Sequence, residues 1–300
     1  MVLDGHIHTS CTPDISGREC RESLLSRMGE AGVDGGMLLS MDPMGCGKQF
    51  TARERLEKLM DIAGHPNLYT AYWIDPTADD ASEQVDLAVS FGINAFKVIC
   101  SRFHPSDERA MATYRKIAEK GKPILFHSGI SWDGLNSAKN NRPGEFECLI
   151  NIPDLKFTLA HVSWPWCDEC IAVYGKFNNA YYWRDDVSCE MFIDVTPGTP
   201  PLWREEVFRK LFCGDYDVAH NVIFGSDCSA HEYNAGWTAD WMRRDGELYE
   251  KFGFDCDDFR DHIYGENLLR FLGLSDEKFE KKVPMIAESA SETLTRIEGR

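Results

Sequence analysis

The sequence lacks the features that would place the protein in a membrane, in the secretory pathway or on a nucleic acid. No apolar stretch approaches the roughly 20 uninterrupted residues that a membrane helix needs. The N-terminus carries neither the basic segment nor the long apolar segment of a secretory signal. The 32 lysines and arginines are outnumbered by 49 aspartates and glutamates, and the net charge of −17 argues against binding to a phosphate backbone.

The 11 cysteines do not form a recognisable disulfide framework. They are scattered and odd in number, and several lie within apolar runs, such as Cys100, Cys213 and Cys228. Free cysteine packs as a small hydrophobic residue, so the pattern favours a reduced, cytoplasmic protein. Cys167 and Cys170 are separated by two residues, but no second ligand pair of suitable spacing follows them. We interpret them as ordinary cysteines at the start of a helix, with a redox pair as the alternative.

Apolar runs typical of strands recur at intervals of about thirty residues, the size of a strand–helix–strand unit. They begin near residues 1, 35, 67, 93, 123, 155, 188 and 221. Amphipathic segments lie between them, at 21–31, 51–64, 80–92, 108–121, 167–178 and 205–213, with a short helix expected at 144–150. Four of the longer segments end at a glycine of the kind that follows a helix, namely Gly32, Gly64, Gly92 and Gly121.

Eight such units predict an α/β fold, a closed (β/α)8 TIM barrel, with a doubly wound open sheet as the alternative. No Gly-x-Gly-x-x-Gly follows the first strand, which disfavours a dinucleotide-binding sheet. We expect a single barrel domain over 1–274, with extra helices at 257–274, and a polar C-terminal tail over 275–300. The last four residues, Ile-Glu-Gly-Arg, resemble a protease-recognition linker and are left out of the functional reasoning.

Polar, titratable side chains end several of the predicted strands. His6 and His8 are two positions apart, so in a strand both imidazoles face the same way. His127, His161 and Asp227 each follow a later apolar run. Active sites of barrels lie at the C-terminal ends of the strands, so the pattern predicts a shared pocket that contains ligands favoured by zinc and similar ions.

Short motifs in the same order resemble the amidohydrolase superfamily, and within it the barrels related to aminocarboxymuconate-semialdehyde decarboxylase. They are Asp-Gly-His-Ile-His at 4–8, His-Ser-Gly at 127–129, Ala-His at 160–161, Phe-Gly-Ser-Asp at 224–227 and the segment 264–274. Together they span nearly the whole chain. Each motif is short, and the resemblance rests on the set.

The resemblance implies a divalent ion bound by His6, His8, His127 and Asp227, with one Zn²⁺ expected and Mn²⁺ or Fe²⁺ as alternatives. The ion would activate a water molecule, and Asp227 would take its proton and deliver it to the leaving group. His161 would lie beside the ion and either polarise the substrate or act as a second acid or base.

Four further residues are candidates for substrate or second-metal binding. Lys97 ends the fourth strand, where binuclear relatives carry a carbamylated lysine that bridges two metals. An unmodified Lys97 would instead pair with an anionic substrate, or with a carboxylate at the mouth of the barrel. Trp132, Arg142 and His231 lie on loops after the fifth and eighth strands, and each has an ordinary solvated loop residue as its alternative.

The sequence therefore predicts a metal-dependent hydrolase that attacks an amide, lactone or other ester carbonyl of a small molecule. A non-oxidative decarboxylase of an aromatic or unsaturated carboxylic acid is the second hypothesis. After His8 the chain runs Thr-Ser-Cys-Thr-Pro and offers no arginine to clamp such an acid, which favours hydrolysis. A metal-free or non-catalytic ligand-binding barrel is the third hypothesis, and a homodimer is an open alternative to a monomer.

Overall fold

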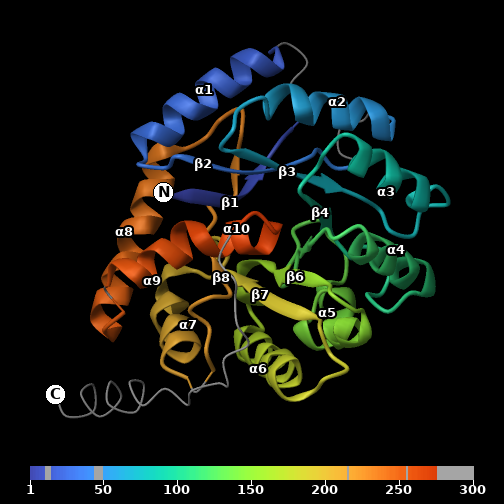
Figure 1. Ribbon diagram of the computed structural model, residues 1–300. Coiled ribbons are helices and arrows are strands. Elements are labelled where there is room, and N and C mark those ends of the chain that lie inside the picture. Colours follow the sequence, from blue (N-terminus) through green and yellow to red (C-terminus); the bar gives the residue numbers. More distant parts are fainter. Residues whose placement is uncertain (11–14, 44–49, 215, 255, 276–300) are drawn as a thin grey trace.

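The computed structural model describes residues 1–10, 15–43, 50–214, 216–254 and 256–275. Strands and helices alternate along the chain, and the strands form the centre of the molecule (Figure 1). The strands are β1 (Leu3–His8), β2 (Gly35–Leu39), β3 (Leu68–Trp73), β4 (Ala95–Val98), β5 (Ile124–Phe126), β6 (Lys156–Leu159), β7 (Glu190–Asp194), β8 (Val222–Ile223) and β9 (Cys228–Ser229).

The helices surround this sheet, as Figure 1 shows. They are α1 (Gly17–Glu30), α2 (Ala52–Ile62), α3 (Ala81–Ser90), α4 (Glu108–Glu119), α5 (Ser137–Asn140), α6 (Cys167–Trp183), α7 (Pro201–Phe212), α8 (Ala235–Phe252), α9 (Asp257–Asp261) and α10 (Asn267–Leu272). Shorter helical turns are η1 (Pro143–Asn151), η2 (Ala160–Ser163) and η3 (His262–Glu266). No helix among the described residues has both the length and the apolar composition that crossing a bilayer requires.

The sheet is parallel, and its order is β8-β7-β6-β5-β4-β3-β2-β1-β9. β8 and β9 both lie within residues 222–229, so the two ends of this order belong to the same part of the chain. Two backbone hydrogen bonds join β1 to this segment. The Gly5 N–H donates to the Phe224 carbonyl at 2.9 Å, and the Asp227 N–H donates to the His6 carbonyl at 3.0 Å. The barrel therefore closes between β1 and the β8–β9 segment, as predicted for a (β/α)8 barrel.

The interior of the barrel is apolar, and one end of it is closed by the C-terminal helices. Leu268 and Phe271 of α10 join the interior cluster that contains Leu3 and Phe192. Arg270 donates to Glu190 at the start of β7 at 2.6 Å, which places α10 at the N-terminal ends of the strands. The polar residues that end the strands lie at the opposite end of the barrel.

Most helices begin where the sequence indicates, because local capping and the apolar pattern agree. Ser16 and Glu19 form a reciprocal cap at the start of α1, and Thr51 and Glu54 do the same at the start of α2. Gly32, Gly92 and Gly121 have the positive φ that favours glycine after a helix.

Gly64 also follows its helix, α2, as predicted, but it does not have a positive φ. A Cβ there would meet only the flexible end of the Arg21 side chain, so nothing in the backbone requires glycine at this position. The helix α8 was not predicted from the sequence, and His262 on the turn after α9 is buried against Asp258 and His220. The predicted tail, 275–300, lies outside the described residues except for Ser275.

The nine described cysteines are free, and seven of them are buried: Cys20, Cys100, Cys167, Cys170, Cys189, Cys213 and Cys228. Cys167 and Cys170 lie in the first turns of α6 as predicted, and burial raises the pKa of each thiol, to about 11 and about 12.

Candidate metal centre

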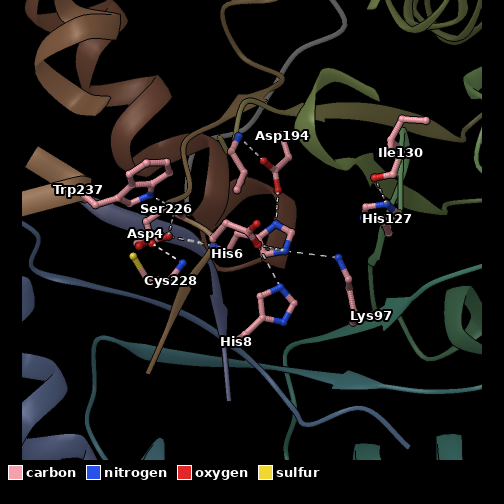
Figure 2. Close-up of polar contacts among 12 residues, drawn as sticks. Asp4, His6, His8, Lys97, His127, Ile130, Asp194, Ser226, Cys228 and Trp237 are labelled. Atoms are coloured by element: carbon pink, nitrogen blue, oxygen red, sulfur yellow. Dashed lines mark hydrogen bonds and ion pairs between the residues drawn. The ribbon is translucent and has the colours of Figure 1, made fainter. Parts of the chain in front are cut away.

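The polar residues at the C-terminal ends of the strands converge at the open end of the barrel. His6 and His8 come from β1, Lys97 from β4, and Asp227 from the segment between β8 and β9. Figure 2 shows the His6, His8 and Lys97 side chains pointing toward one another, with Asp194 above the His6 ring. Nε2 of His6, Nε2 of His8 and a carboxylate oxygen of Asp227 all lie within 4.8 Å of one another.

His6 is held by a buried carboxylate that the sequence analysis missed. Its Nδ1 lies 2.7 Å from Oδ2 of Asp194, and both side chains are essentially inaccessible. A carboxylate only accepts, so Nδ1 carries the hydrogen and Nε2 keeps its lone pair for the shared centre. Burial, and next the positive charge of Lys97, lower the pKa of His6 well below its usual 6.5, so the ring is neutral as a metal ligand must be.

His8 and Asp227 complete the group at ligand-like separations. Oδ1 of Asp227 lies 3.1 Å from Nε2 of His8 and 3.5 Å from Nε2 of His6. Two ligands of one tetrahedral zinc ion, each bound at about 2.05 Å, are separated by about 3.3 Å. The two observed distances straddle that value, so the Asp227 oxygen lies at ligand spacing from each imidazole.

Asp227 is held in an unusual backbone conformation, with a φ of 60°. A non-glycine residue in this left-handed region is uncommon, and such residues cluster at functional sites. Burial alone would raise the pKa of its carboxyl, but the hydrogen bond with His8 and the neighbouring imidazoles hold that pKa well below the usual value. The side chain therefore faces the site as a carboxylate.

Lys97 is buried at 1% exposure, and its Nζ lies 3.5 Å from Nε2 of His6. Burial lowers the pKa of its ammonium to about 8, despite the opposing charges of Asp194 and Asp227. Among the described residues no carboxylate oxygen lies within ion-pair distance of the Lys97 amine, although the charges of Asp194 and Asp227 act on it. A role in metal binding, in substrate binding or in pairing with a carboxylate stays a prediction for Lys97.

His161 lies next to this group on a strained turn. Its ring centroid is 5.4 Å from that of His6 and 5.2 Å from that of His127. His161, Val162 and Ser163 all have positive φ, which is costly for non-glycine residues and most so for the β-branched valine. Gly198 allows the approach, since a Cβ there would lie 2.8 Å from Cβ of His161.

His127 packs against His161 and is not one of the three-residue group. Its Nε2 lies 3.2 Å from the Ile130 carbonyl, and Figure 2 shows the ring directed at that carbonyl. Burial, and next the charge of His161, lower the pKa of His127 well below 6.5, so its ring is neutral too. Ligation by His127 stays a prediction.

The remaining candidates are divided between the site and the surface. Trp132 lines a pocket of about 220 Å³ together with His161 and Asp227. Arg142 does not line this pocket, because its guanidinium pairs with Glu169 at 2.6 Å. His231 lies on a separate hollow, where its Nε2 is 3.0 Å from the Ser10 carbonyl.

Two buried aspartates, Asp194 and Asp4, support the centre, and neither was predicted from the sequence to do so. Asp194 ends the apolar run Met-Phe-Ile at 191–193, the same signal that marked His127 and Asp227, so it could have been found. Asp4 accepts hydrogen bonds from the Tyr233 hydroxyl at 2.9 Å and the Ser226 N–H at 2.9 Å, and thus ties β1 to the turn before Asp227. Burial raises the pKa of Asp4 to about 6.

No protein-family profile matches the chain, and no curated protein matches it. Solved structures with the same fold include an amidohydrolase from Burkholderia multivorans with bound zinc, at 10% identity and a TM-score of 0.62, covering 92% of this chain and all of that one. A probable 2-pyrone-4,6-dicarboxylic acid hydrolase from Acinetobacter baumannii matches at 13% identity and a TM-score of 0.59, covering 91% and 99% of the two chains. A 2,6-dihydroxybenzoate decarboxylase from Rhizobium matches at 13% identity and a TM-score of 0.57, covering 91% and 98%. These structures are members of the amidohydrolase superfamily, and the chain has the barrel fold that they share.

Proposed function

We propose that the protein is a metal-dependent hydrolase that attacks an amide, lactone or other ester carbonyl of a small molecule. The observation that carries the proposal is the group of three donor atoms from His6, His8 and Asp227, with His6 oriented by Asp194. A carboxylate that orients a metal-ligating imidazole is the usual partner of such ligands in metalloenzymes. The proposal also agrees with the activities named for the hydrolases that share the fold.

His6, His8 and Asp227 would hold the ion, and His127 would join them once its ring leaves the Ile130 carbonyl. Two imidazoles and a carboxylate suit Zn²⁺, our first expectation, and also suit Mn²⁺ or Fe²⁺. When bound, such an ion acidifies water and polarises a carbonyl group. With His6, His8 and Asp227 as its only protein ligands, the ion would keep coordination positions open for water and for the substrate carbonyl. A closed structural site would keep none open.

The protein groups supply the proton transfers and the orientation. Asp227 lines the pocket, and its carboxylate adjoins both imidazoles of β1, so it can accept a proton from the attacking water and pass it to the leaving group. His161 also lines the pocket and is held rigidly by its turn, which suits it to orient the carbonyl oxygen.

Hydrolysis is favoured over decarboxylation by the charge of the pocket. Among the described residues none of the nine that line it is lysine or arginine, and Arg142 is already paired with Glu169. A carboxylic acid substrate would therefore find in these walls no arginine to clamp it, and the amine nearest to Asp227 is Lys97, which lies beside His6 in the candidate metal centre. The free, mostly buried cysteines favour a cytoplasmic location for this enzyme.

The test is metal analysis combined with a substrate panel. Protein supplemented separately with zinc, manganese and iron is expected to retain about one ion per chain, to hydrolyse members of a panel of esters, lactones and amides, and to lose this activity on chelation. Release of carbon dioxide from aromatic acids without hydrolysis would favour the decarboxylase. Failure to retain any ion would overturn the proposal and favour the metal-free ligand-binding barrel.

A further inference from the structure

The pocket beside the metal centre has walls that are apolar rather than charged. It is lined by Ser128, Ile130, Trp132, His161, Trp164, Pro197, Gly198, Pro200 and Asp227. The two titratable residues, His161 and Asp227, belong to the chemistry already described. Ser128 is fully buried and its hydroxyl donates to the Asn141 carbonyl at 2.8 Å, so this donor is already committed. The remaining walls offer a substrate mainly apolar contact, although the buried indole nitrogen of Trp164 has no hydrogen-bond partner among the described residues.

Trp132 is exposed in a way that packing within the chain does not explain. Its side chain is 95% accessible, although a tryptophan usually buries most of its large apolar surface. The base of its loop is nevertheless fixed, because the Ile130 N–H donates to the Trp164 carbonyl at 2.8 Å and the Ser131 N–H donates to Ser137 Oγ at 2.9 Å. The loop thus holds a free aromatic face at the edge of the pocket.

Trp164 provides a second, firmer aromatic wall. Its ring packs edge-on against Trp203, with centroids 5.8 Å apart. The pocket volume of about 220 Å³ lies below the roughly 300 Å³ at which pockets for drug-sized ligands begin. The space therefore fits one ring with a small substituent.

From these observations we propose that the substrate carries an uncharged aromatic ring next to its scissile carbonyl, and that Trp132 and Trp164 bind this ring. The inference rests on the proposed hydrolase function and narrows its substrate. An anionic group on the ring would find no balancing side chain in the described walls. A ring rich in hydroxyl groups would find too few partners.

The kinetic test uses three acetate esters and the zinc-loaded protein. Phenyl acetate has a neutral ring, 4-acetoxybenzoate has the same ring with a distal carboxylate, and ethyl acetate has no ring. We expect kcat/KM to be highest for phenyl acetate, even though 4-acetoxybenzoate has the better leaving group. Trp132→Ala should lower kcat/KM for phenyl acetate about fivefold to tenfold, the value of an aromatic contact, and leave that for ethyl acetate within about twofold.

Trp183→Ala is the matched control, because Trp183 is also exposed, at 66%, but lies at the end of α6 and lines no part of the pocket. It should behave as the wild type does with all three esters. A kcat/KM for 4-acetoxybenzoate that equals or exceeds that for phenyl acetate would overturn the proposed ring site, as would an equal effect of the two tryptophan substitutions.

A binding measurement separates the ring site from the hydrolase function. Anisole has a neutral ring and no scissile bond, so its binding is detected by saturation-transfer NMR without turnover. We expect a signal with the wild type and with Trp183→Ala, and its loss with Trp132→Ala. Equal signals in the two variants would overturn the ring site. Absence of hydrolysis of all three esters, with the anisole result as expected, would count against the hydrolase function and leave the ring site supported.

Discussion

Nδ1 of His6 and Oδ2 of Asp194 lie 2.7 Å apart in the interior of the barrel, with both side chains almost completely excluded from solvent. This contact joins β1 to β7 beneath the candidate metal centre. It fixes the hydrogen on Nδ1 and leaves Nε2 unprotonated toward the ligand group. The position of one buried proton therefore decides whether His6 can bind a cation.

Substitution of Asp194 by asparagine should weaken metal binding. The amide can turn its NH2 group toward Nδ1, which would move the ring hydrogen to Nε2 and block the ligand atom. We expect zinc affinity to fall about 10-fold to 100-fold, as when outer partners of ligating histidines are removed elsewhere. Chelator competition measures the affinity, and Asp186→Asn, an exposed carboxylate paired with Arg184, is the control for loss of charge. Equal affinities in the two variants would contradict this role.

The structure also ranks the histidines as ligands. His6→Asn should abolish stoichiometric zinc binding, because Nε2 of His6 lies within the donor group. His127→Asn should weaken binding less, since its ring must first give up its contact with the Ile130 carbonyl. Metal content after gel filtration, measured for both variants in the same buffer, checks the order. A larger loss in His127→Asn would show that the bound state reorganises around that residue.

Unfolding of the chelator-treated protein should depend on pH through His161. Burial lowers the pKa of its ring in the folded state, whereas the unfolded chain titrates near 6.5. Below pH 6.5 the unfolded state therefore binds more protons, and the stability present at higher pH is lost as the pH falls toward the folded pKa. His161→Asn removes the group that takes up this extra proton on unfolding. The variant should therefore lose less free energy of unfolding as the pH falls, by up to about 1.4 kcal/mol per pH unit.

Urea unfolding of wild type and His161→Asn at pH 7.5, 6.5 and 5.5 gives the pH dependence of the free energy of unfolding for each protein. The difference in free energy of unfolding between the two proteins should be constant above pH 7 and change only below it. The buried carboxyl of Asp4, with its pKa of about 6, gains a proton in the folded state and opposes the trend equally in both proteins, so it cancels from the comparison. Parallel curves throughout would show that His161 does not titrate differently on folding.

The buried ion pair between Arg204 and Asp245 should matter for the fold. Their side chains are 3% and 1% exposed and meet at 2.6 Å, and Arg204 also donates to the Val195 carbonyl beside Asp194. Asp245→Ala would leave a buried guanidinium uncompensated and should lower the free energy of unfolding by about 3–5 kcal/mol. Asp240→Ala, on the solvent-facing side of the same helix, should have a much smaller effect. Equal losses in urea unfolding would contradict this assignment.

The fold followed from the sequence because its signals are periodic and local. Apolar runs, helix caps and glycines locate the strands and most helices without knowledge of distant contacts. The buried positions of the missed helix α8 recur at helical spacing, but two of the five, Thr238 and Asp245, are polar and interrupt the apolar pattern. Its buried face became evident only from packing against the rest of the barrel.

Only those site residues whose location follows from their place at the end of a strand could be predicted from the sequence. A residue at the end of a strand must lie at the mouth of the barrel, which is why His6, His8 and Asp227 were found and Asp194 could have been. The direction in which a side chain points, and the partner with which a charged loop residue pairs, depend instead on tertiary contacts. The sequence could not indicate that His127 turns toward Ile130, or that Glu169 occupies Arg142.

The closure of the barrel between β1 and the β8–β9 segment has a consequence for protein synthesis. The donor atoms of His6 and His8 are synthesised more than two hundred residues before the carboxylate of Asp227. Under the proposed function, a nascent chain on the ribosome would have no complete site in which to capture the ion until the β8–β9 segment has emerged and docked. Uptake of the ion would then report that the polypeptide has reached its finished topology.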